Sequence, residues 1–229
     1  MTEGRCTLCG ETYTKQGMTR HLRSCKKDQM DSGTESTFHL AIGDAYRTDY
    51  WMHVEIEHET ALTTLDDFLR DVWLECCGHM SSFTIGDVEY VKPFSEEVAI
   101  SGFGVERRDM EIALGAVLED GMEFTHEYDF GTTTELSLRV VDVGYGATGD
   151  EQVQEHGYQA IRVIARNEPP EITCEACNAL ATTVCTEHLS MREGEAWLCD
   201  GCTAEHECDE YAFLPVVNSP RVGVCGYTG

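Results

Sequence analysis

Hydrophobic and polar residues alternate along the middle of the chain in the pattern of β-strands. Between residues 50 and 58, Met52, Val54 and Ile56 would share one side of a strand, and His53 and Glu55 would share the other. A period of two is typical of a strand with one buried face, so we expect the polar side to face solvent. Further strands are predicted at 38–42, 82–91 and 158–165, and the segments 122–130 and 135–143 are predicted to form a hairpin.

One stretch has the periodicity of a helix instead. Its apolar stripe consists of Leu65, Phe68, Leu69, Val72 and Cys76. Thr63 with Asp66 resembles a capping box at the start of this helix, and Gly78 is placed to end it. A shorter helix is predicted at 109–118. Because strands and helices do not alternate regularly, we predict an α+β core, with a mixed or antiparallel sheet and one main helix.

Changes in composition divide the 229-residue chain into segments. Residues 28–37 are polar and are interpreted as a linker, and Asn167-Glu168-Pro169-Pro170 marks a second boundary. We therefore expect a small module at 1–27, the linker at 28–37, the α+β core at 38–168 and a C-terminal cysteine-rich module at 169–229. Ten of the twelve cysteines lie in the two terminal modules, so their chemistry belongs at the ends of the chain.

The N-terminal module has the ligand spacing of a small zinc finger. Two cysteines separated by two residues let one turn present both thiolates to the same ion. Tyr13 occupies the position where a ββα finger places a core aromatic residue. The expected ligands of a closed, tetrahedral zinc site are Cys6, Cys9, His21 and Cys25.

The C-terminal module allows two arrangements of zinc ligands. A single site would use Cys174, Cys177, Cys199 and Cys202. A cross-braced module with two ions would add Cys185 and His188, completed by two of His206, Cys208 and Cys225. We favour two ions, with His206 and Cys208 in the ligand set, because a single site leaves several ligand-type residues without a role. The whole chain is then predicted to hold three zinc ions, and zinc binding would supply the folding energy of this module.

The remaining cysteines are Cys76, Cys77 and Cys225, and the Cys76-Cys77-Gly78-His79 segment could indicate a redox or metal site. Cys76 continues the apolar stripe of the main helix, so a packing role is favoured for the Cys76-Cys77-Gly78-His79 segment. Cys225 is a candidate ligand or a buried thiol in the apolar segment 213–229, which we expect to pack back onto the core. A disulfide framework is the alternative for the C-terminal cysteines, but it gives the interleaved histidines no role.

The charge balance is extreme and uneven. The chain has 42 acidic and 16 basic residues, a formal net charge of −26. Such self-repulsion is tolerated in concentrated salt, where the screening length falls to about 3 Å at 1 M. We therefore interpret the chain as a salt-adapted, haloarchaeal protein; an acidic partner-binding surface is the alternative. Without a signal peptide or a long apolar run, we expect a cytoplasmic protein that does not contact a membrane.

Against this background the N-terminal module is basic, with six basic and two acidic residues in 1–27. Arg20, Arg23, Lys26 and Lys27 cluster on its predicted helix and could meet the phosphates of DNA or RNA. The alternative is a finger that folds this end of the chain or docks a protein partner. One finger alone reads only about three base pairs, so sequence-specific recognition by this finger would be limited.

The core carries a family resemblance. Tyr128-Asp129-Phe130-Gly131 after a strand, together with Trp73-Leu74-Glu75-Cys76-Cys77-Gly78-His79, resembles the signature of the plasmid pRiA4b ORF-three-like family. The resemblance covers residues 36–168 and implies an α+β core. Members are often labelled mobile-element passenger proteins, a label of context that implies no particular activity.

Taken together, the patterns favour a zinc-binding adaptor for a nucleic acid or a protein partner. The competing hypothesis is an enzyme with its site in the core near His126, Glu127 and Asp129. No nucleophile–base pair stands out in the sequence, so we assign no catalytic residue and name no cofactor other than zinc.

Overall fold

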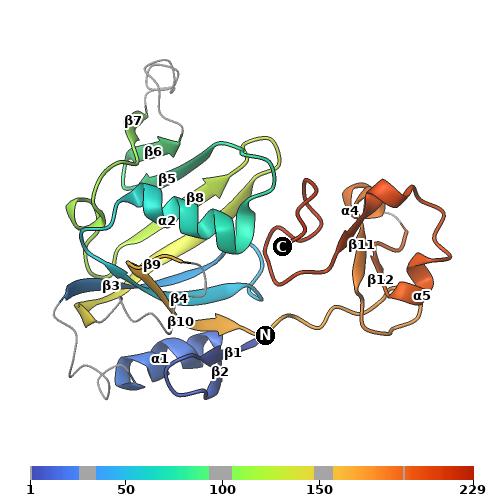
Figure 1. Cartoon of the computed structure of the whole chain (residues 1–229), viewed down its shortest axis with the longest axis horizontal. Helices are drawn as coiled ribbons and strands as arrows, with labels where there is room; N and C mark the ends of the chain where they lie inside the picture. Colours follow the sequence, from blue (N-terminus) through green and yellow to red (C-terminus); the bar gives the residue numbers. More distant parts are fainter. Residues whose placement is uncertain (1, 26–34, 93–104, 147–156, 193) are drawn as a thin grey trace.

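The structure is a computed structural model that describes residues 2–25, 35–92, 105–146, 157–192 and 194–229. A large α+β part contains both the N-terminal module and the predicted core, and a smaller cysteine-rich module lies beside it (Figure 1). Among the described helices, none has the length and apolar character needed to cross a membrane. The fold is therefore α+β, as the patterns predict.

The large part is organised around one sheet of ten described strands, almost all antiparallel. Only β6 and β7 pair in parallel. The strands follow the order β2-β1-β10-β4-β3-β9-β8-β5-β6-β7. Their bounds are β1 Glu3–Cys6, β2 Thr12–Thr14, β3 Glu35–Asp44, β4 Trp51–Glu57, β5 Ser81–Ile85, β6 Val88–Lys92, β7 Glu106–Asp109, β8 Glu123–Tyr128, β9 Thr134–Gly146 and β10 Ile161–Asn167.

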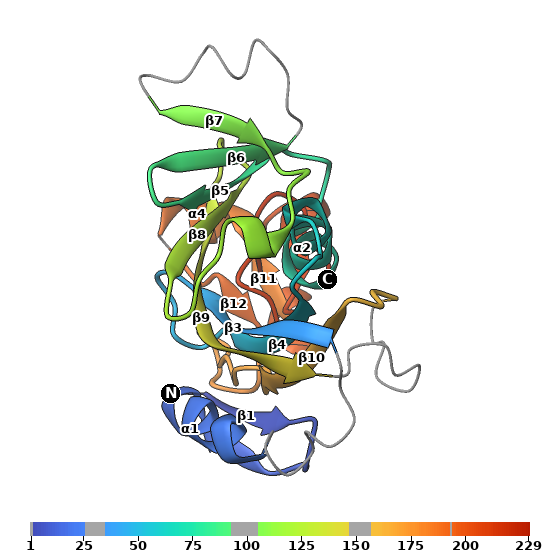
Figure 2. The same ribbon diagram turned by 90° about the vertical axis from the view of Figure 1, so that its left-hand side faces the viewer.

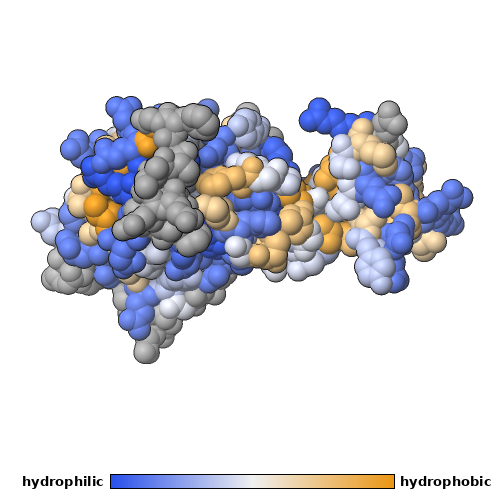
Figure 3. Space-filling view, turned by 90° about the horizontal axis from the view of Figure 1, so that it is seen from above, coloured by the Kyte–Doolittle hydropathy of each residue, from blue (hydrophilic) through white to orange (hydrophobic). Residues whose placement is uncertain are grey.

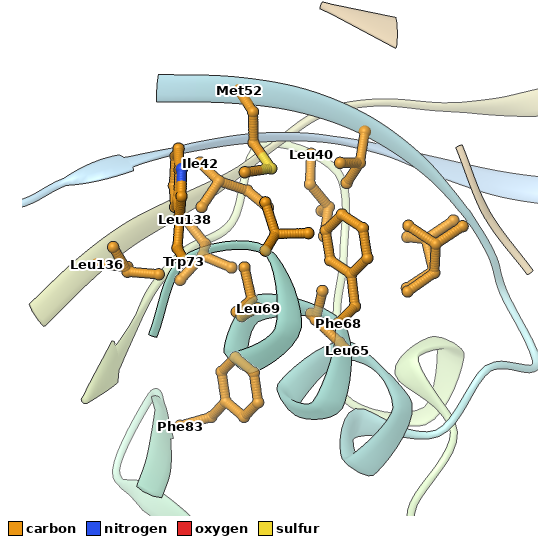
Figure 4. Close-up of a cluster of buried hydrophobic side chains, with 14 of the residues drawn as sticks. Leu40, Ile42, Met52, Leu65, Phe68, Leu69, Trp73, Phe83, Leu136 and Leu138 are labelled. Carbon is orange, nitrogen blue, oxygen red and sulfur yellow. The ribbon is translucent and has the colours of Figure 1, made fainter. Parts of the chain in front are cut away.

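The helix α2, Leu62–Leu69, covers one face of the sheet and closes the hydrophobic core (Figure 4). Leu65, Phe68 and Leu69 are buried against strand residues such as Leu40 and Met52. The helix continues as a π-helical turn, η2 Arg70–Leu74, which buries Trp73. Burial of such large apolar side chains stabilises the fold by roughly 1.5–3 kcal/mol each, so this stripe is the main contact between helix and sheet.

The predicted ends of the main helix are wrong. The helix begins after Ala61 without a side-chain cap, and the Thr63 hydroxyl donates to the Met110 carbonyl instead. Helical structure stops at Leu74, so Gly78 lies in the following loop, where its φ of 74° lets the chain turn. Cys76 is thus outside the helix, although it still packs against the core.

Two other elements differ from the prediction. The segment 82–91 is a hairpin of β5 and β6 rather than one strand, because Gly86 makes the turn with φ 59°. The predicted helix at 109–118 is reduced to one 3-10 turn, η3 Leu114–Ala116. The hairpin predicted at 122–130 and 135–143 is present as β8 and β9.

The polar side of β4 does not face solvent. His53 is 1% exposed and Glu55 is 4% exposed. The N-terminal module covers part of this side, and the hydroxyl of Thr19 on its helix lies 3.4 Å from His53 Nε2. The alternation predicted the strand correctly, but it could not reveal that a second layer covers the polar face.

The N-terminal module, residues 2–25, is a ββα finger that joins the main sheet. It consists of β1, β2 and the helix α1, Lys15–Cys25, and it lies at the β10 end of the sheet (Figure 2). β1 pairs antiparallel with β10, so the finger extends the sheet by two strands. A Cβ on Gly4 would lie 2.4 Å from the Arg166 carbonyl oxygen and 2.5 Å from the Trp51 ring, so only glycine permits this approach.

The C-terminal module is a small three-stranded sheet with two short helices. The sheet order is β12-β11-β13, and no described strand of it pairs with the main sheet. In Figure 3 a narrower region with visible hydrophobic residues joins it to the main body. Its elements are β11 Thr183–Cys185, α4 Thr186–Met191, β12 Trp197–Leu198, α5 Asp200–Thr203, η4 Glu210–Ala212 and β13 Phe213–Pro215.

The tail, residues 216–229, returns from this module to the core. The Ser219 hydroxyl donates to the Trp73 carbonyl at 2.6 Å, and Val222 belongs to the main hydrophobic cluster. Arg221 is fully buried, and its guanidinium lies 2.6 Å from the Asp129 carboxylate. The expectation that this segment packs onto the core is therefore correct.

Candidate metal centres

The cysteines gather into four clusters, each with four candidate ligand atoms within 4.8 Å of one another. All twelve cysteines lie in the described part of the chain, and none of them forms a disulfide. Three clusters contain the ligands predicted from the sequence. The fourth, which the sequence interpretation missed, combines Cys76, Cys77, His79 and Cys225.

The finger cluster is Cys6, Cys9, His21 and Cys25, as predicted. The two cysteines of the β1–β2 turn face the middle and the end of α1, with Cys9 Sγ 3.3 Å from His21 Nε2. The Tyr13 ring stacks on the His21 ring at a centroid distance of 4.4 Å, which fixes the imidazole. Burial, followed by contact with the Cys9 and Cys6 thiols, raises the pKa of Cys25 to about 12, so ionisation at neutral pH needs a cation to offset the charge.

The first module cluster is Cys174, Cys177, Cys199 and Cys202. The two pairs come from the turn before β11 and from the start of α5, and the sulfurs of Cys177 and Cys199 are 3.6 Å apart. Burial would raise the pKa of the Cys174 thiol, but backbone N–H groups of Cys199, Cys177 and Ala176 point at it and lower its pKa to about 6. The backbone here is arranged to stabilise a thiolate, which is the ligand form of cysteine.

The second module cluster is Cys185, His188, His206 and Cys208. His206 and Cys208 complete this set of four, whereas Cys225 lies in the fourth cluster. Along the chain the ligands come in four pairs. The first and third pairs, Cys174/Cys177 and Cys199/Cys202, form the first module cluster, and the second and fourth pairs form the second module cluster. This is the cross-braced order that we expected of a two-ion module.

Buried imidazole nitrogens support a metal in this cluster. Among the described residues, His188 Nδ1 and His206 Nε2 are buried without a hydrogen-bond partner in the protein. A buried polar atom without a partner is costly, and a coordinated ion would use the nitrogen lone pair. Burial and the adjacent Cys185 thiol raise the pKa of Cys208 to about 11, which also calls for a cation.

The spacing of the sulfurs fits a tetrahedral ion and excludes a disulfide. With Zn–S near 2.3 Å and Zn–N near 2.0 Å, ligand atoms of a tetrahedral site lie about 3.8 Å apart for two sulfurs and about 3.5 Å for sulfur and nitrogen. Sulfur–sulfur distances of 3.6–3.8 Å in the first module cluster and in the fourth cluster match that edge. A disulfide would need about 2.05 Å. Each cluster could therefore hold a metal ion.

The fourth cluster, called here the tail cluster, joins the core loop after η2 to the tail. Cys77 Sγ lies 2.9 Å from His79 Nε2, 3.7 Å from Cys76 Sγ and 3.8 Å from Cys225 Sγ. Cys77 and Cys225 are exposed. The interpretation of Cys225 as a buried thiol is therefore wrong. The Cys-Cys-Gly-His spacing indicated three candidate ligands, but the fourth, Cys225, is 146 residues from His79 in the sequence.

The candidate nucleic-acid residues are only partly described. Arg20 and Arg23 are exposed on α1, on the side away from the buried Met18 and Leu22. Lys26 and Lys27 lie outside the described residues.

A groove of about 800 Å³ lies between α1 and the face of the sheet opposite α2. Its lining combines apolar residues such as Trp51 and Phe124 with polar ones, which include Lys15 and Thr19 from the finger and Arg139 from the core. Burial lowers the pKa of Lys15, although the Asp44 carboxylate acts in the opposite direction. The finger thus builds a surface jointly with the core.

The structure describes the three candidate enzymatic residues, His126, Glu127 and Asp129. His126 is fully buried, and its Nε2 lies 2.8 Å from the Asp66 carboxylate. Asp129 is buried and pairs with Arg221, while its Oδ1 accepts hydrogen bonds from the backbone of Gly131 and Thr132. Burial, followed by repulsion from Glu135, raises the pKa of Glu127. These three side chains therefore serve separate contacts.

Comparisons with known proteins add no function. No family model matches the chain, and no curated protein matches it. A solved structure similar to it is a protein of unknown function, MM3350, from Methanosarcina mazei Go1. The similarity has a TM-score of 0.42 and 16% identity, and it covers 51% of this chain and 66% of that chain, just under two thirds.

Proposed function

We propose that the protein is a zinc-binding adaptor in which metal ions fold the finger and the C-terminal module. The observation that carries this is the convergence of the twelve predicted ligands into three separate sets of four. Cysteine and histidine in sets of four are typical of structural zinc, and such sites leave no open position for catalysis. Zinc is the preferred metal because imidazole and thiolate together suit it better than magnesium or calcium.

Metal analysis of the intact protein tests this proposal. Protein purified under reducing conditions is expected to contain at least three zinc ions by native mass spectrometry and elemental analysis. Cys9→Ser and Cys177→Ser are each expected to remove one ion, because each takes a ligand from a different set. Protein that carries no zinc, and takes up none when zinc is supplied, would contradict the proposal.

For the partner, we propose contact between the exposed face of α1 and the phosphates of DNA or RNA. Arg20 and Arg23 lie on this face, and they belong to the basic end of a protein with a net charge of −26. Phosphate contacts made by two arginines release counterions, so binding should weaken as salt rises. A protein partner on the same face or on the C-terminal module is the competing proposal.

Binding to fluorescent DNA and RNA of mixed sequence, measured over a series of KCl concentrations, tests the partner. The double variant Arg20→Glu/Arg23→Glu should weaken binding and reduce the slope of log K against log salt by about two on duplex DNA. Arg108→Glu/Arg192→Glu is the matched control, because it makes the same charge change far from α1 in the sequence. Equal losses in both variants, or no binding by the natural sequence, would point to a protein partner instead while leaving the zinc proposal intact.

The enzyme hypothesis has no geometric support in the described residues, since His126 and Asp129 are engaged in buried pairs. The relationship of the core to the plasmid pRiA4b ORF-three-like family stays a prediction, carried by residues 73–79 and 128–131. The salt-adapted character also stays a prediction.

A further inference from the structure

The tail cluster has the geometry of a metal site that spans two distant parts of the chain. His79 Nε2 faces it, at 2.9 Å from Cys77 Sγ and 3.3 Å from Cys225 Sγ. The sulfurs of Cys76 and Cys77 are 3.7 Å apart, and those of Cys77 and Cys225 are 3.8 Å apart. The sulfur–sulfur distances match the edge of a tetrahedral site, about 3.8 Å, and the two sulfur–nitrogen distances are shorter than the edge of about 3.5 Å, so the imidazole would move outward by a few tenths of an ångström to bind an ion.

The backbone on both sides is bent to bring these side chains together. Cys225 has a φ of 50° and lies between Gly223 and Gly226, which also have positive φ. The left-handed region is unfavourable for a residue with a Cβ. Packing does not explain this cost, because Cys225 is exposed. A shared ligand with the core explains both the strain and the direction of the thiol.

The surroundings of the tail cluster are those of a thiolate site. The guanidinium of the buried Arg221 donates to Cys76 Sγ at 3.4 Å and to the Asp129 carboxylate at 2.6 Å. Three thiolates around a divalent ion leave one excess negative charge, which the positive charge of the Arg221 guanidinium offsets. Asp129 Oδ2 lies 3.5 Å from His79 Nε2, the nitrogen that faces the cluster, so this carboxylate borders the site and does not hold the other ring nitrogen. Arg221, which contacts a ligand sulfur directly, is the kind of outer partner that orients ligands in metal sites.

Packing alone and a disulfide each explain less. Packing accounts for Cys76, which touches the core, but not for the exposed Cys77 and Cys225. A disulfide between Cys77 and Cys225 leaves His79 facing two sulfurs without a role, and their present separation of 3.8 Å is far beyond a covalent bond. A metal ion uses all four side chains at once.

We propose that Cys76, Cys77, His79 and Cys225 bind a fourth divalent metal ion of the zinc class, which fastens the tail to the α+β core. This ion is distinct from the three that the sequence predicts, and it is the one that connects the core to the end of the C-terminal module. Because two of its ligands are exposed, while Cys6, Cys174 and Cys185 are fully buried in the other three clusters, it should exchange fastest with added chelator.

Counting ions in matched variants of the full chain tests this proposal. The natural sequence, loaded with zinc under reducing conditions, is expected to carry four ions by native mass spectrometry, and Cys225→Ser is expected to carry three. Val224→Ser is the control, because it places the same side chain one residue away and should keep four. Three ions in both the natural sequence and Cys225→Ser would overturn the fourth site without affecting the other three.

A second pair of variants keeps the test decisive if Cys225→Ser misfolds. His79→Ala should lose one ion, whereas His79→Cys restores a fourth ligand and should retain it. Loss of the ion should also raise hydrogen exchange in the tail around Val222, while exchange in β8 and β9 stays unchanged. Equal ion counts in the two His79 variants, or a Cys77–Cys225 disulfide found by mass in the natural protein despite reductant, would contradict the proposal.

Discussion

Asp66 illustrates what happens to single residues when the chain folds. The sequence pattern suggested a capping role, but the carboxylate is completely buried and accepts hydrogen bonds from His126 and Arg70. Burial would raise its pKa, but the His126 hydrogen bond and charge, followed by the Arg70 charge, outweigh burial and lower it. Periodicity can predict that a position is buried. It cannot predict that the partner of a buried charge comes from a strand 60 residues away.

We therefore expect Asp66→Asn to lower the free energy of unfolding by about 3–5 kcal/mol, because it leaves the buried Arg70 without its full counter-charge. Urea denaturation measures this. Asp67→Asn on the same helix is the control; its side chain is 49% exposed and pairs with Lys92, so about 1 kcal/mol or less is expected. Similar losses in both variants would show that the buried network contributes little.

The stability that Asp66 contributes depends on pH in a direction that follows from its lowered pKa. The folded-state pKa of Asp66 is lowered, so its stabilisation is fully present above the unfolded value near 3.9 and is lost as pH falls through the lower folded value. Below about pH 4 the difference in stability between the natural protein and Asp66→Asn should therefore shrink. Denaturation series at several pH values check this, and a difference that widens on acidification would contradict it.

Secondary-structure elements were more predictable than their partners. Alternation located β3, β4, β8, β9 and β10 because the apolar residues of each lie on one side, although both sides of β4 are buried, and the helical stripe located α2. The order of strands could not be read in this way, since β1 pairs with β10 from the far end of the chain. The same limit applies to the clusters. Ligands close in sequence were identified, whereas Cys225 was not joined to Cys76, Cys77 and His79.

The joint between β1 and β10 depends on Gly4. Gly4→Ala is expected to destabilise the protein by about 1–3 kcal/mol, because the new methyl group would meet the Arg166 carbonyl and the Trp51 ring. Gly144→Ala in β9 is the control, since a Cβ there meets no atom within 4 Å. Denaturation midpoints and limited proteolysis of the finger measure the effect. Equal tolerance of both variants would mean that the finger does not depend on this contact.

At the scale of the whole molecule, stability has two separate sources. The main sheet and α2 enclose a large hydrophobic cluster that reaches Val184 of β11, whereas the C-terminal module's own cluster consists mostly of cysteines. Removal of metal by a chelator should therefore unfold the C-terminal module and leave the core folded. Hydrogen exchange should rise in β11 and β12 but not in β8 and β9. Excess zinc added with the chelator is the control, and uniform loss of protection would contradict this division.

The net charge of −26 gives a second prediction for the whole molecule. Repulsion between carboxylates should weaken as KCl rises toward 1 M, where the screening length is about 3 Å. The thermal midpoint of the zinc-loaded protein should therefore increase with KCl. The same series in sucrose of equal osmolality is the control, because sucrose is excluded from the protein surface but does not screen charge. A midpoint that does not change with salt would contradict the interpretation as a salt-adapted protein.

The position of β10 has a consequence for the order of folding. The finger contains only local contacts and one candidate ion, so it can form early and on its own. Its final place requires pairing with β10, about 160 residues later in the chain, and bringing such distant segments together is slow. Refolding with zinc present should thus have a fast phase for the finger and a later docking phase, in which Trp51 becomes buried.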